Sequence, residues 1–407
     1  MNIPTPLRKL ATPFLAGAMA LSLSNAARCA DGDAAPEKPA YVPAPEPVKT
    51  SILVGAHNCP LWEGSPSGGV WAQVVKHPER TPALGRYDDT NPEVADWETK
   101  WAVEHGINFF VYCWYRAGKA DAVETRYAGA IEALKKSKFA DQFHFSIMWE
   151  NQSRDLNSWG QSGVSGESDL LERLLPFWME NYFKYPGYLK IDNKPLLYIY
   201  DARKLGADLG GPANVAAAFD KMRAFCKKAG FDGLYLLSEL RYPSPQELAF
   251  RKEMGFDYIF EYCLPVADVA HPVATQLSLL QKMRETSPLP QIVTVSQGWS
   301  GWHDEGPNYH LPPAQFEELL RGAKAIIETM PAHELGSKLL LLDCWNEWSE
   351  GHYIAPHQEF GFGYLDAVRR VFSSAPEPHQ DLLPHDIGRG PYEQGSPTAG
   401  VTTKKTD

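Results

Sequence analysis

Two acidic residues three positions apart, Glu347 and Glu350, follow an apolar run near the end of the chain. The run is 339-LLLLDCW-345, and it gives way to 346-NEWSEG-351. If the residues after Trp345 turn helically, this spacing places both carboxylates on one side of the turn. Two acids in a partly desolvated pocket cannot both stay ionised, so the pKa of one of them should rise. Such a pair would supply a general acid and a general base near neutral pH.

Further polar and aromatic residues fall at the ends of the other predicted strands. Pyranose rings stack on aromatic side chains, and sugar hydroxyls bond to carboxylates and amides. The set therefore predicts an oligosaccharide or polysaccharide substrate, with Glu347 and Glu350 as the catalytic residues. In a structural alternative, Glu350 caps the loop and Glu347 pairs with Arg116 or a lysine. The predicted substrate-binding residues are His57, Asn58, Trp114, Tyr115, Trp149, Glu150, Asn151, Asp201, Glu239, Glu261, Tyr262, Trp299, Asn346, Trp348 and Tyr353.

Eight short runs rich in β-branched or aromatic residues predict buried strands. They cover residues 51–56, 108–115, 143–149, 196–201, 234–239, 258–263, 291–296 and 339–345. Segments with apolar residues at three-to-four spacing predict helices over 91–106, 127–137, 169–183, 214–230, 245–255, 274–285 and 313–330. Thr90 and Glu93 have the spacing of a capping box at the start of the first helix.

Strands that alternate with helices predict an α/β fold, a single (β/α)8 TIM barrel with enlarged βα loops. An open doubly wound sheet is the main alternative, and such sheets usually bind a nucleotide through a glycine-rich first turn. The first predicted strand is followed by 57-HNCPLWEG-64, which contains no GxGxxG pattern. The barrel is therefore favoured, and its catalytic groups should gather at the carboxyl ends of the strands.

The composition limits the partners and cofactors. The 407 residues carry a formal net charge of −11, which argues against nucleic acid or an anionic membrane surface as a partner. No CxxC or HExxH pattern occurs, so we expect neither a metal nor a cofactor. The cysteines in the predicted body lack paired spacing and leave the disulfides undetermined: Cys59, Cys113, Cys226, Cys263 and Cys344. We expect a monomer.

Four segments make up the predicted domain organisation. Residues 1–26 read as a signal peptide, with Arg8 and Lys9 before an apolar stretch and a small-x-small site at Ser24-Asn25-Ala26. Residues 27–49 form a Pro/Ala-rich linker, residues 50–373 the catalytic barrel, and residues 374–407 a tail that packs at first and is then disordered. We therefore expect export to the periplasm or the medium, with no membrane span in the mature chain.

The stretch 343-DCWNEWSEGHYIAPHQEFGFGYLDAVRR-370 resembles the signature of family 99 glycoside hydrolases and the related WbsX-type polysaccharide-biosynthesis proteins. Looser similarities lie in 85–115, 186–201 and 295–302, so the resemblance spans most of residues 51–372. It implies a metal-free (β/α)8 glycosidase that acts on α-linked mannose or similar sugars with retention. It also implies that Glu347 deprotonates the 2-hydroxyl of the sugar and that Glu350 is the general acid, then the general base.

Two points separate this sequence from the endo-α-mannosidase pattern. Ala355 stands where an acidic residue precedes the proline, and no H-I-E-P-Y-like stretch occurs. The identity of the sugar therefore stays open. The leading hypothesis is a secreted glycoside hydrolase of α-linked glycans. The alternatives are a WbsX-type glycosyltransferase of polysaccharide biosynthesis, which fits poorly with an exported chain, and a carbohydrate-binding protein without catalysis.

Overall fold

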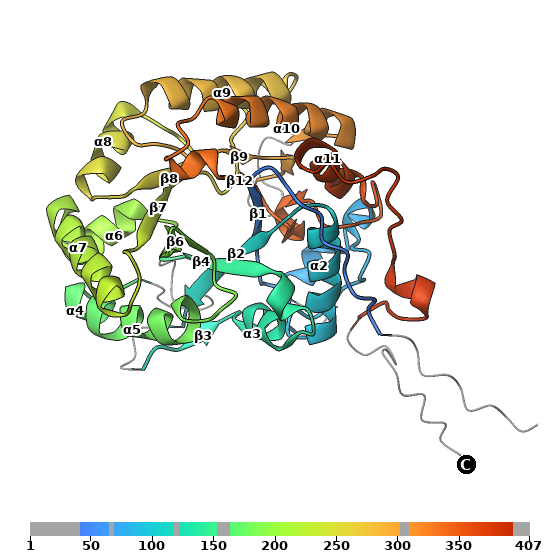
Figure 1. Ribbon diagram of the computed structural model, residues 1–407, viewed down its shortest axis with the longest axis horizontal. Coiled ribbons are helices and arrows are strands. Elements are labelled where there is room, and N and C mark those ends of the chain that lie inside the picture. Colours follow the sequence, from blue (N-terminus) through green and yellow to red (C-terminus); the bar gives the residue numbers. More distant parts are fainter. Residues whose placement is uncertain (1–40, 65–68, 118–121, 153–162, 302–308, 394–407) are drawn as a thin grey trace, which may run out of the picture. The chain divides into compact units, whose positions relative to one another are not determined.

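The computed structural model describes residues 41–64, 69–117, 122–152, 163–301 and 309–393. Eight strands that pair in parallel with their neighbours form its centre, in the order β8-β7-β6-β4-β2-β1-β12-β9 (Figure 1). A parallel bridge between Ile259 and Gln291 spans the remaining gap beside β8. The predicted (β/α)8 barrel is confirmed. The strands are β1 (Leu53–Asn58), β2 (Phe109–Arg116), β4 (His144–Trp149), β6 (Lys194–Ile199), β7 (Tyr235–Glu239), β8 (Tyr258–Phe260), β9 (Thr294–Val295) and β12 (Leu339–Leu342).

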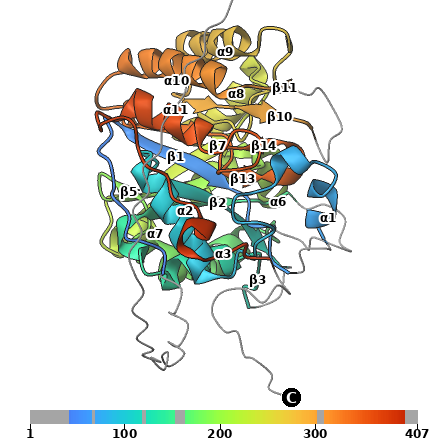
Figure 2. The same cartoon turned by 90° about the vertical axis from the view of Figure 1, so that its right-hand side faces the viewer.

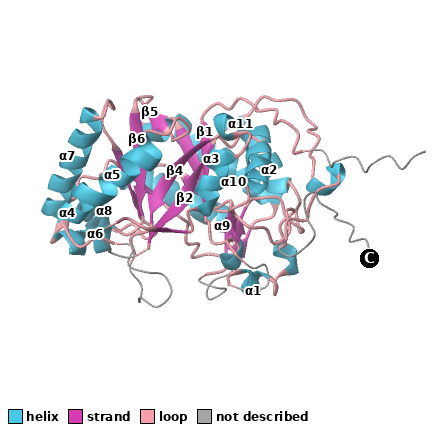
Figure 3. Cartoon of the chain, turned by 90° about the horizontal axis from the view of Figure 1, so that it is seen from below, coloured by secondary structure: helices cyan, strands magenta, loops and turns pink. Residues whose placement is uncertain are grey.

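Helices surround these strands on the outside of the barrel (Figure 1), and Figure 3 shows them to the left and right of the strands. They are α2 (Pro92–Glu104), α3 (Gly129–Lys136), α7 (Pro212–Lys228), α8 (Pro245–Glu253), α9 (Pro272–Thr286), α10 (Pro313–Glu328) and α11 (Gly363–Phe372). The helix predicted over 169–183 is a continuous segment in which π-helical turns join α4 (Glu167–Asp169) to α5 (Leu175–Trp178). The short helices α1 (Trp71–Val74) and α6 (Ala202–Leu209) were not predicted. Asn91, rather than Thr90, caps α2 by accepting a hydrogen bond from the Glu93 amide.

Successive side chains on each strand point to opposite faces, which builds two apolar layers. On β2, Phe109, Val111 and Cys113 belong to the cluster that fills the barrel interior. The alternate residues Phe110 and Tyr112 belong to the larger cluster between the strands and the helices. The strands are therefore apolar on both faces, which explains their continuous apolar sequences.

The longest connections lie at the carboxyl ends of the strands, as the prediction of enlarged βα loops requires. Residues 59–91 join β1 to α2, and residues 343–362 join β12 to α11. The loop after β12 carries the short strands β13 (Asn346–Glu347) and β14 (His352–Tyr353). The connection after β9 carries β10 (Gly298–Trp299) and β11 (Tyr309–His310), and all four lie at one end of the barrel (Figure 2). The other short strands, β3 (Thr125–Arg126) and β5 (Lys190–Ile191), pair with β2 and β6.

The chain on either side of the barrel packs against α2. Residues 41–49 fall in the predicted linker, yet the Tyr41 hydroxyl donates to Asp96 and the Val48 amide bonds to the Val103 carbonyl. The packed body therefore begins before residue 50. Residues 374–393 of the tail also lie against the barrel, where the Trp101 indole donates to the Leu382 carbonyl. The predicted signal peptide, residues 27–40 of the linker and residues 394–407 of the tail lie outside the described residues.

Two further features bear on the predictions. Cys59, Cys113, Cys226, Cys263 and Cys344 are each buried and free. Among the described residues, no helix is long and apolar enough to cross a membrane.

A buried ion pair fixes the end of β2 to α4. The Arg116 guanidinium bonds to Asp169 through two hydrogen bonds of 2.7 and 3.0 Å. Burial alone would raise the pKa of Asp169, but the contact with Arg116 lowers it to about 2. Arg116 is thus paired with Asp169 rather than with Glu347, which argues against one of the two partners, Arg116 or a lysine, that the structural alternative gave Glu347.

We expect Asp169→Asn to lower the free energy of unfolding by about 3–5 kcal/mol, because it leaves the buried Arg116 charge without its partner. The matched control is Glu167→Gln, which breaks the exposed pair with Lys221 and should cost at most about 1 kcal/mol. Urea denaturation of the three chains measures both values. Equal stability of Asp169→Asn and the parent would contradict the prediction.

Candidate active site

The N-E-W-S-E-G motif forms a tight hairpin at the carboxyl end of the barrel. The strands β13 and β14 pair antiparallel, with Asn346 opposite Tyr353 and Glu347 opposite His352. A single 3₁₀ turn, Trp348–Glu350, joins them and ends at Gly351, whose φ of 70° is left-handed. The expected helical turn is thus confined to three residues, with Glu347 in the strand before it. Both acids project from one short, covalently continuous element.

Hydrogen bonds tie this hairpin to the end of β1. The Asn346 side chain accepts from the Cys59 amide at 2.7 Å and donates to the Asn58 side chain at 3.3 Å. The Trp345 amide bonds to the His57 carbonyl at 2.6 Å. Asn58 and Asn346 are no more than 1% exposed. They position the hairpin, which corrects their predicted role in binding substrate directly.

Glu347 lies almost completely buried, with 4% of its surface exposed. The Tyr262 hydroxyl donates to its Oε2 at 3.2 Å, and the Ser349 hydroxyl donates to its Oε1 at 3.0 Å. Burial raises the pKa of Glu347 to about 8, and the nearby charge of Glu350 contributes to the rise. Glu347 therefore retains a proton at neutral pH.

Glu350 has a more polar environment. The Trp299 indole donates to its Oε2 at 3.1 Å, and His352 Nε2 lies 3.6 Å from the same oxygen. Burial alone would raise the pKa of Glu350, but the contacts with His352 and Trp299 lower it below its ordinary value. Glu350 is therefore ionised at neutral pH, and the two acids together hold one proton.

The buried carboxyl group of Asp343 lies beside His352, at the ring nitrogen that does not face Glu350. Asp343 Oδ2 lies 3.8 Å from His352 Nδ1, and both residues are fully buried. Burial raises the pKa of Asp343 well above its ordinary value and lowers the pKa of His352. Both shifts favour the uncharged form, so Glu350 is the member of this row whose environment favours the negative charge.

Several predicted residues gather around the pair. Tyr262 and Trp299 contact the two acids directly, and the His57 ring lies 5.1 Å from the ring of Tyr262. Burial lowers the pKa of His57 to about 3, and its Nδ1 lies 2.8 Å from the Asp343 carbonyl. His57 is thus a neutral, buried residue beside Tyr262, and its predicted contact with the sugar stays a prediction.

Three more predicted residues lie near the same end of the barrel. Glu239 accepts a hydrogen bond of 2.8 Å from Arg241, whose charge also lowers the pKa of Glu350. Burial raises the pKa of the Tyr115 phenol, with the charges of Glu150 and Glu347 adding to the effect. Tyr115, Glu150 and Glu239 therefore remain candidates for contacting the substrate.

The tryptophans predicted to stack on sugars are mostly core residues. Trp114 is 1% exposed and donates to the Tyr182 hydroxyl, in the layer between strands and helices. Trp149 is equally buried and packs 5.2 Å from the ring of Trp178. Trp348 lies behind the hairpin, 4.7 Å from Tyr353, which is also buried. These four residues are corrected from substrate binding to packing.

The remaining predicted residues have structural partners. The Asn151 side chain donates to the Asp201 carbonyl at 2.8 Å and accepts from the Asp201 amide at 2.7 Å, which joins the ends of β4 and β6. Asp201 also caps α6. Glu261 is fully buried; burial raises the pKa of its carboxyl well above its ordinary value, and the charge of Glu239 adds to the rise. Among the described contacts, none of the three is hydrogen-bonded or ion-paired to Glu347 or Glu350.

The sequence analysis missed three residues of the site: His352, Ser349 and Arg241. His352 and Ser349 belong to the same motif as the acids, so their position beside Glu350 and Glu347 was a usable signal. Arg241 lies two residues beyond the predicted strand 234–239, and no local pattern marks it. A pocket of about 570 Å³ opens beside Thr50, Leu53 and Lys338 and contains none of the predicted site residues.

A family model described as Glycosyltransferase WbsX matches residues 75–297 and 308–368, which is well over half of the chain. The chain belongs to the WbsX family. The resemblance drawn from the motif is therefore confirmed.

Relatives of this WbsX-family chain are distant. It is 24% identical over 327 residues to a protein of Xanthomonas campestris pv. campestris named Uncharacterized protein WxcX, present in two strains. The match covers 73% of this chain and 44% of that protein, so the chain matches less than half of its length.

Two solved structures share the barrel. Both are of a GH99 endo-alpha-mannosidase from Bacteroides thetaiotaomicron, one of them in complex with BIS-TRIS-propane. Their TM-scores are 0.54 and 0.52 at 16% identity, and the matches cover 79% of this chain and 96% and 97% of theirs. At this level of identity the similarity establishes the fold.

Gly351→Ala tests how tightly the hairpin is built. A Cβ at this position would lie 2.3 Å from the Ser300 hydroxyl, and the φ of 70° disfavours any side chain. We expect a loss of about 2–4 kcal/mol in the free energy of unfolding. Gly361→Ala is the control, because its φ of 54° is also positive but its Cβ would meet nothing within 4 Å, so about 1–2 kcal/mol is expected. Equal losses in chemical denaturation would show that the close contact with Ser300 is unimportant.

The raised pKa of Glu347 predicts a stability that depends on pH. Between about pH 4.5 and 8 the folded chain keeps the Glu347 proton while the unfolded chain loses it, so stability falls as the pH rises through this range. Glu347→Gln removes this loss, and its melting temperature should exceed that of the parent progressively from pH 5 to pH 8. Glu253→Gln, at an exposed position on α8, should follow the parent. A constant difference between Glu347→Gln and the parent across this range would contradict the raised pKa.

Proposed function

We propose that this chain is a carbohydrate-active enzyme that hydrolyses α-linked glycans with retention through Glu347 and Glu350. The observation that carries the proposal is the buried pair of carboxyls on one hairpin, whose pKa values are shifted in opposite directions. Hydrolysis of a glycosidic bond requires one carboxyl that gives a proton and a second that accepts one. A barrel mouth in which two carboxyls share one proton meets that requirement.

The resemblance suggests how the two groups would act. Glu347 would take the proton of the sugar 2-hydroxyl while that oxygen attacks the anomeric carbon, and Glu350 would protonate the departing glycosidic oxygen. Water would then open the resulting 1,2-anhydro sugar, giving its proton to Glu350 while Glu347 returns its proton to the 2-oxygen. Both carboxyls end in their starting states, and no metal takes part.

The electrostatics of the unliganded chain favour a second assignment of these roles. The shared proton lies on Glu347 and the charge on Glu350, which is the reverse of what the resemblance implies. The first assignment therefore requires the proton to pass to Glu350 when the glycan binds. In the second, Glu347 is the acid and Glu350 the base. The two assignments predict different behaviour of the same pair of variants.

The description of the family supports an alternative reaction, glycosyl transfer. A transferase would move a sugar from an activated donor to an acceptor and would release no reducing ends into water. Export, which we also propose for residues 1–26, favours hydrolysis because activated donors are made inside the cell. N-terminal sequencing of the mature protein tests export, and Ala27 is the expected first residue.

The first experiment compares parent, Glu350→Gln and Glu347→Gln on α-mannans and other α-linked glycans, with release of reducing ends as the readout. We expect release by the parent and a loss of about 100-fold or more in both variants. Glu253→Gln should match the parent. Tight glycan binding without release by any chain would instead establish a carbohydrate-binding protein, and elongation of an added acceptor would establish a transferase.

An aryl glycoside of the released sugar then separates the two roles. Because its leaving group needs little protonation, a variant that lacks only the general acid should recover most of its activity on this substrate. Recovery by Glu350→Gln and not by Glu347→Gln supports the roles implied by the resemblance. Recovery by Glu347→Gln alone assigns the acid role to Glu347. Full activity of either variant on the glycan itself would remove that residue from the mechanism.

A further inference from the structure

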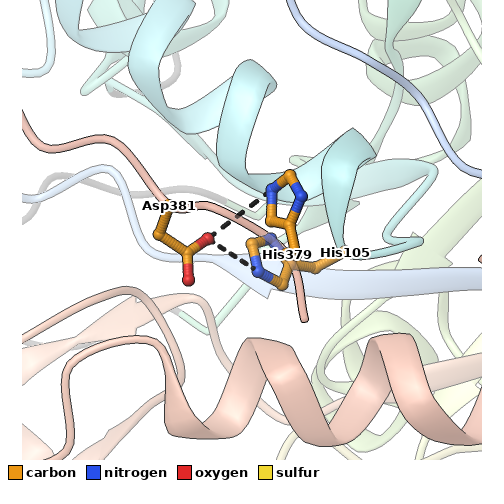
Figure 4. A group of neighbouring side chains, drawn as sticks. All are labelled: His105, His379 and Asp381. Atoms are coloured by element: carbon orange, nitrogen blue, oxygen red, sulfur yellow. Dashed lines mark ion pairs between the residues drawn. The ribbon is translucent and has the colours of Figure 1, made fainter. Parts of the chain in front are cut away.

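A second group of titratable side chains lies outside the barrel, where the tail crosses between α2 and α11. His105 follows α2, Asp366 belongs to the first turn of α11, and His379 and Asp381 belong to the tail. Figure 4 shows His105, His379 and Asp381 turned toward one another from two separate segments. The catalytic mechanism uses none of these residues. His105 precedes β2 and so belongs to the amino end of that strand, whereas Glu347 and Glu350 follow β12 at its carboxyl end.

The distances within the group match the spacing of ligands around a small cation. Nitrogen and oxygen atoms of His105, His379 and Asp381 all lie within 4.8 Å of one another. Asp381 Oδ1 lies 3.2 Å from His105 Nε2 and 3.6 Å from His379 Nε2. Ligands about 2.0–2.1 Å from a tetrahedral zinc ion are roughly 3.3–3.4 Å apart. Asp366 Oδ1 lies 3.6 Å from His105 Nε2 but does not belong to the group of three.

The imidazole of His105 is held as a metal ligand would be. Its Nδ1 lies 2.7 Å from the Trp101 carbonyl and donates to it, so Nε2 is the nitrogen that faces the group. A backbone bond of this kind is the usual support of a metal-binding histidine. Among the described residues, the buried atoms His105 Nε2, His379 Nε2 and Asp381 Oδ1 make no hydrogen bond. They are joined by ion-pair contacts of 3.2 and 3.6 Å rather than by hydrogen bonds, so each nitrogen and oxygen still has a lone pair or proton position for another partner.

The charge around the group favours a cation. Glu104 approaches His379 with 3.5 Å between Oε2 and Nε2, and it is already paired with Lys100 at 2.5 Å. Asp366 and Asp381 have no comparable lysine or arginine pair among the described contacts, so two carboxylate charges face the imidazoles. Two imidazoles with carboxylates suit Zn²⁺, whereas Ca²⁺ and Mg²⁺ prefer oxygen ligands alone.

We propose that His105, His379 and Asp381 bind one Zn²⁺ that fastens the tail to the barrel wall. The ion joins two separate segments at the opposite end of the barrel from Glu347 and Glu350, so we assign it a structural role. The absence of CxxC and HExxH patterns gave no sign of this site, because its ligands come from positions 105, 379 and 381. The proposal is independent of the reaction proposed above.

The test uses the whole chain without a histidine tag. After treatment with a chelator and dialysis, the parent is titrated with Zn²⁺ against a chromophoric indicator, and its zinc content is measured by mass spectrometry. We expect one zinc per chain and a higher melting temperature with zinc than with EDTA. His379→Ala should weaken zinc binding by at least about 100-fold and remove the rise in melting temperature.

The matched control is His385→Ala, because His385 is an exposed histidine of the same tail, and it should bind zinc like the parent. Equal affinity of the parent and His379→Ala would overturn the site. A parent that binds no zinc and melts equally with zinc and EDTA would show instead a metal-free ion pair. Zinc bound without a rise in melting temperature would overturn the fastening role.

Discussion

The site depends on one constraint, the burial of two carboxyl groups on a single hairpin. Two buried carboxylates are costly to charge together without a cation between them. Arg241, whose charge acts on Glu350, is bound to Glu239, and Arg80 is bound to the Trp348 carbonyl. The pair resolves the conflict by sharing one proton between Glu347 and Glu350. The burial that makes the pair costly to fold also makes it able to give and accept protons near neutral pH.

The barrel makes this arrangement possible because it holds the hairpin rigidly. Asn346 and Asn58 tie the hairpin to β1, and Arg80 donates to the Trp348 carbonyl from the long loop after β1. The buried rings of Trp348 and Tyr353, both part of the hairpin, pack against each other. The aromatic residues near the motif thus exclude water from the carboxyls rather than offer a surface to sugars. The exclusion of water raises the pKa of Glu347, so the packing of the hairpin also sets the acid–base behaviour of its carboxyl.

The barrel could be predicted because its eight strands and most of its long helices show in the local sequence, as apolar runs and as three-to-four spacing. The direction of individual side chains could not. The strands are apolar on both faces, so no polar alternation showed that Trp114 and Trp149 point to the helices. The cap of α2 was misplaced by one residue, since both Thr90 and Asn91 are good caps and only the backbone geometry selects Asn91.

The candidate site divides in the same way. Glu347 and Glu350 could be predicted as a pair because three residues separate them, and a short turn keeps them together. Their tuning could not be predicted, because the groups that control it come from other elements. Tyr262 reaches Glu347 from the end of β8, and Trp299 reaches Glu350 from β10. A sequence can therefore identify two acids that share one short turn. Which of the two carries the proton depends on contacts with other elements that form only when the barrel folds.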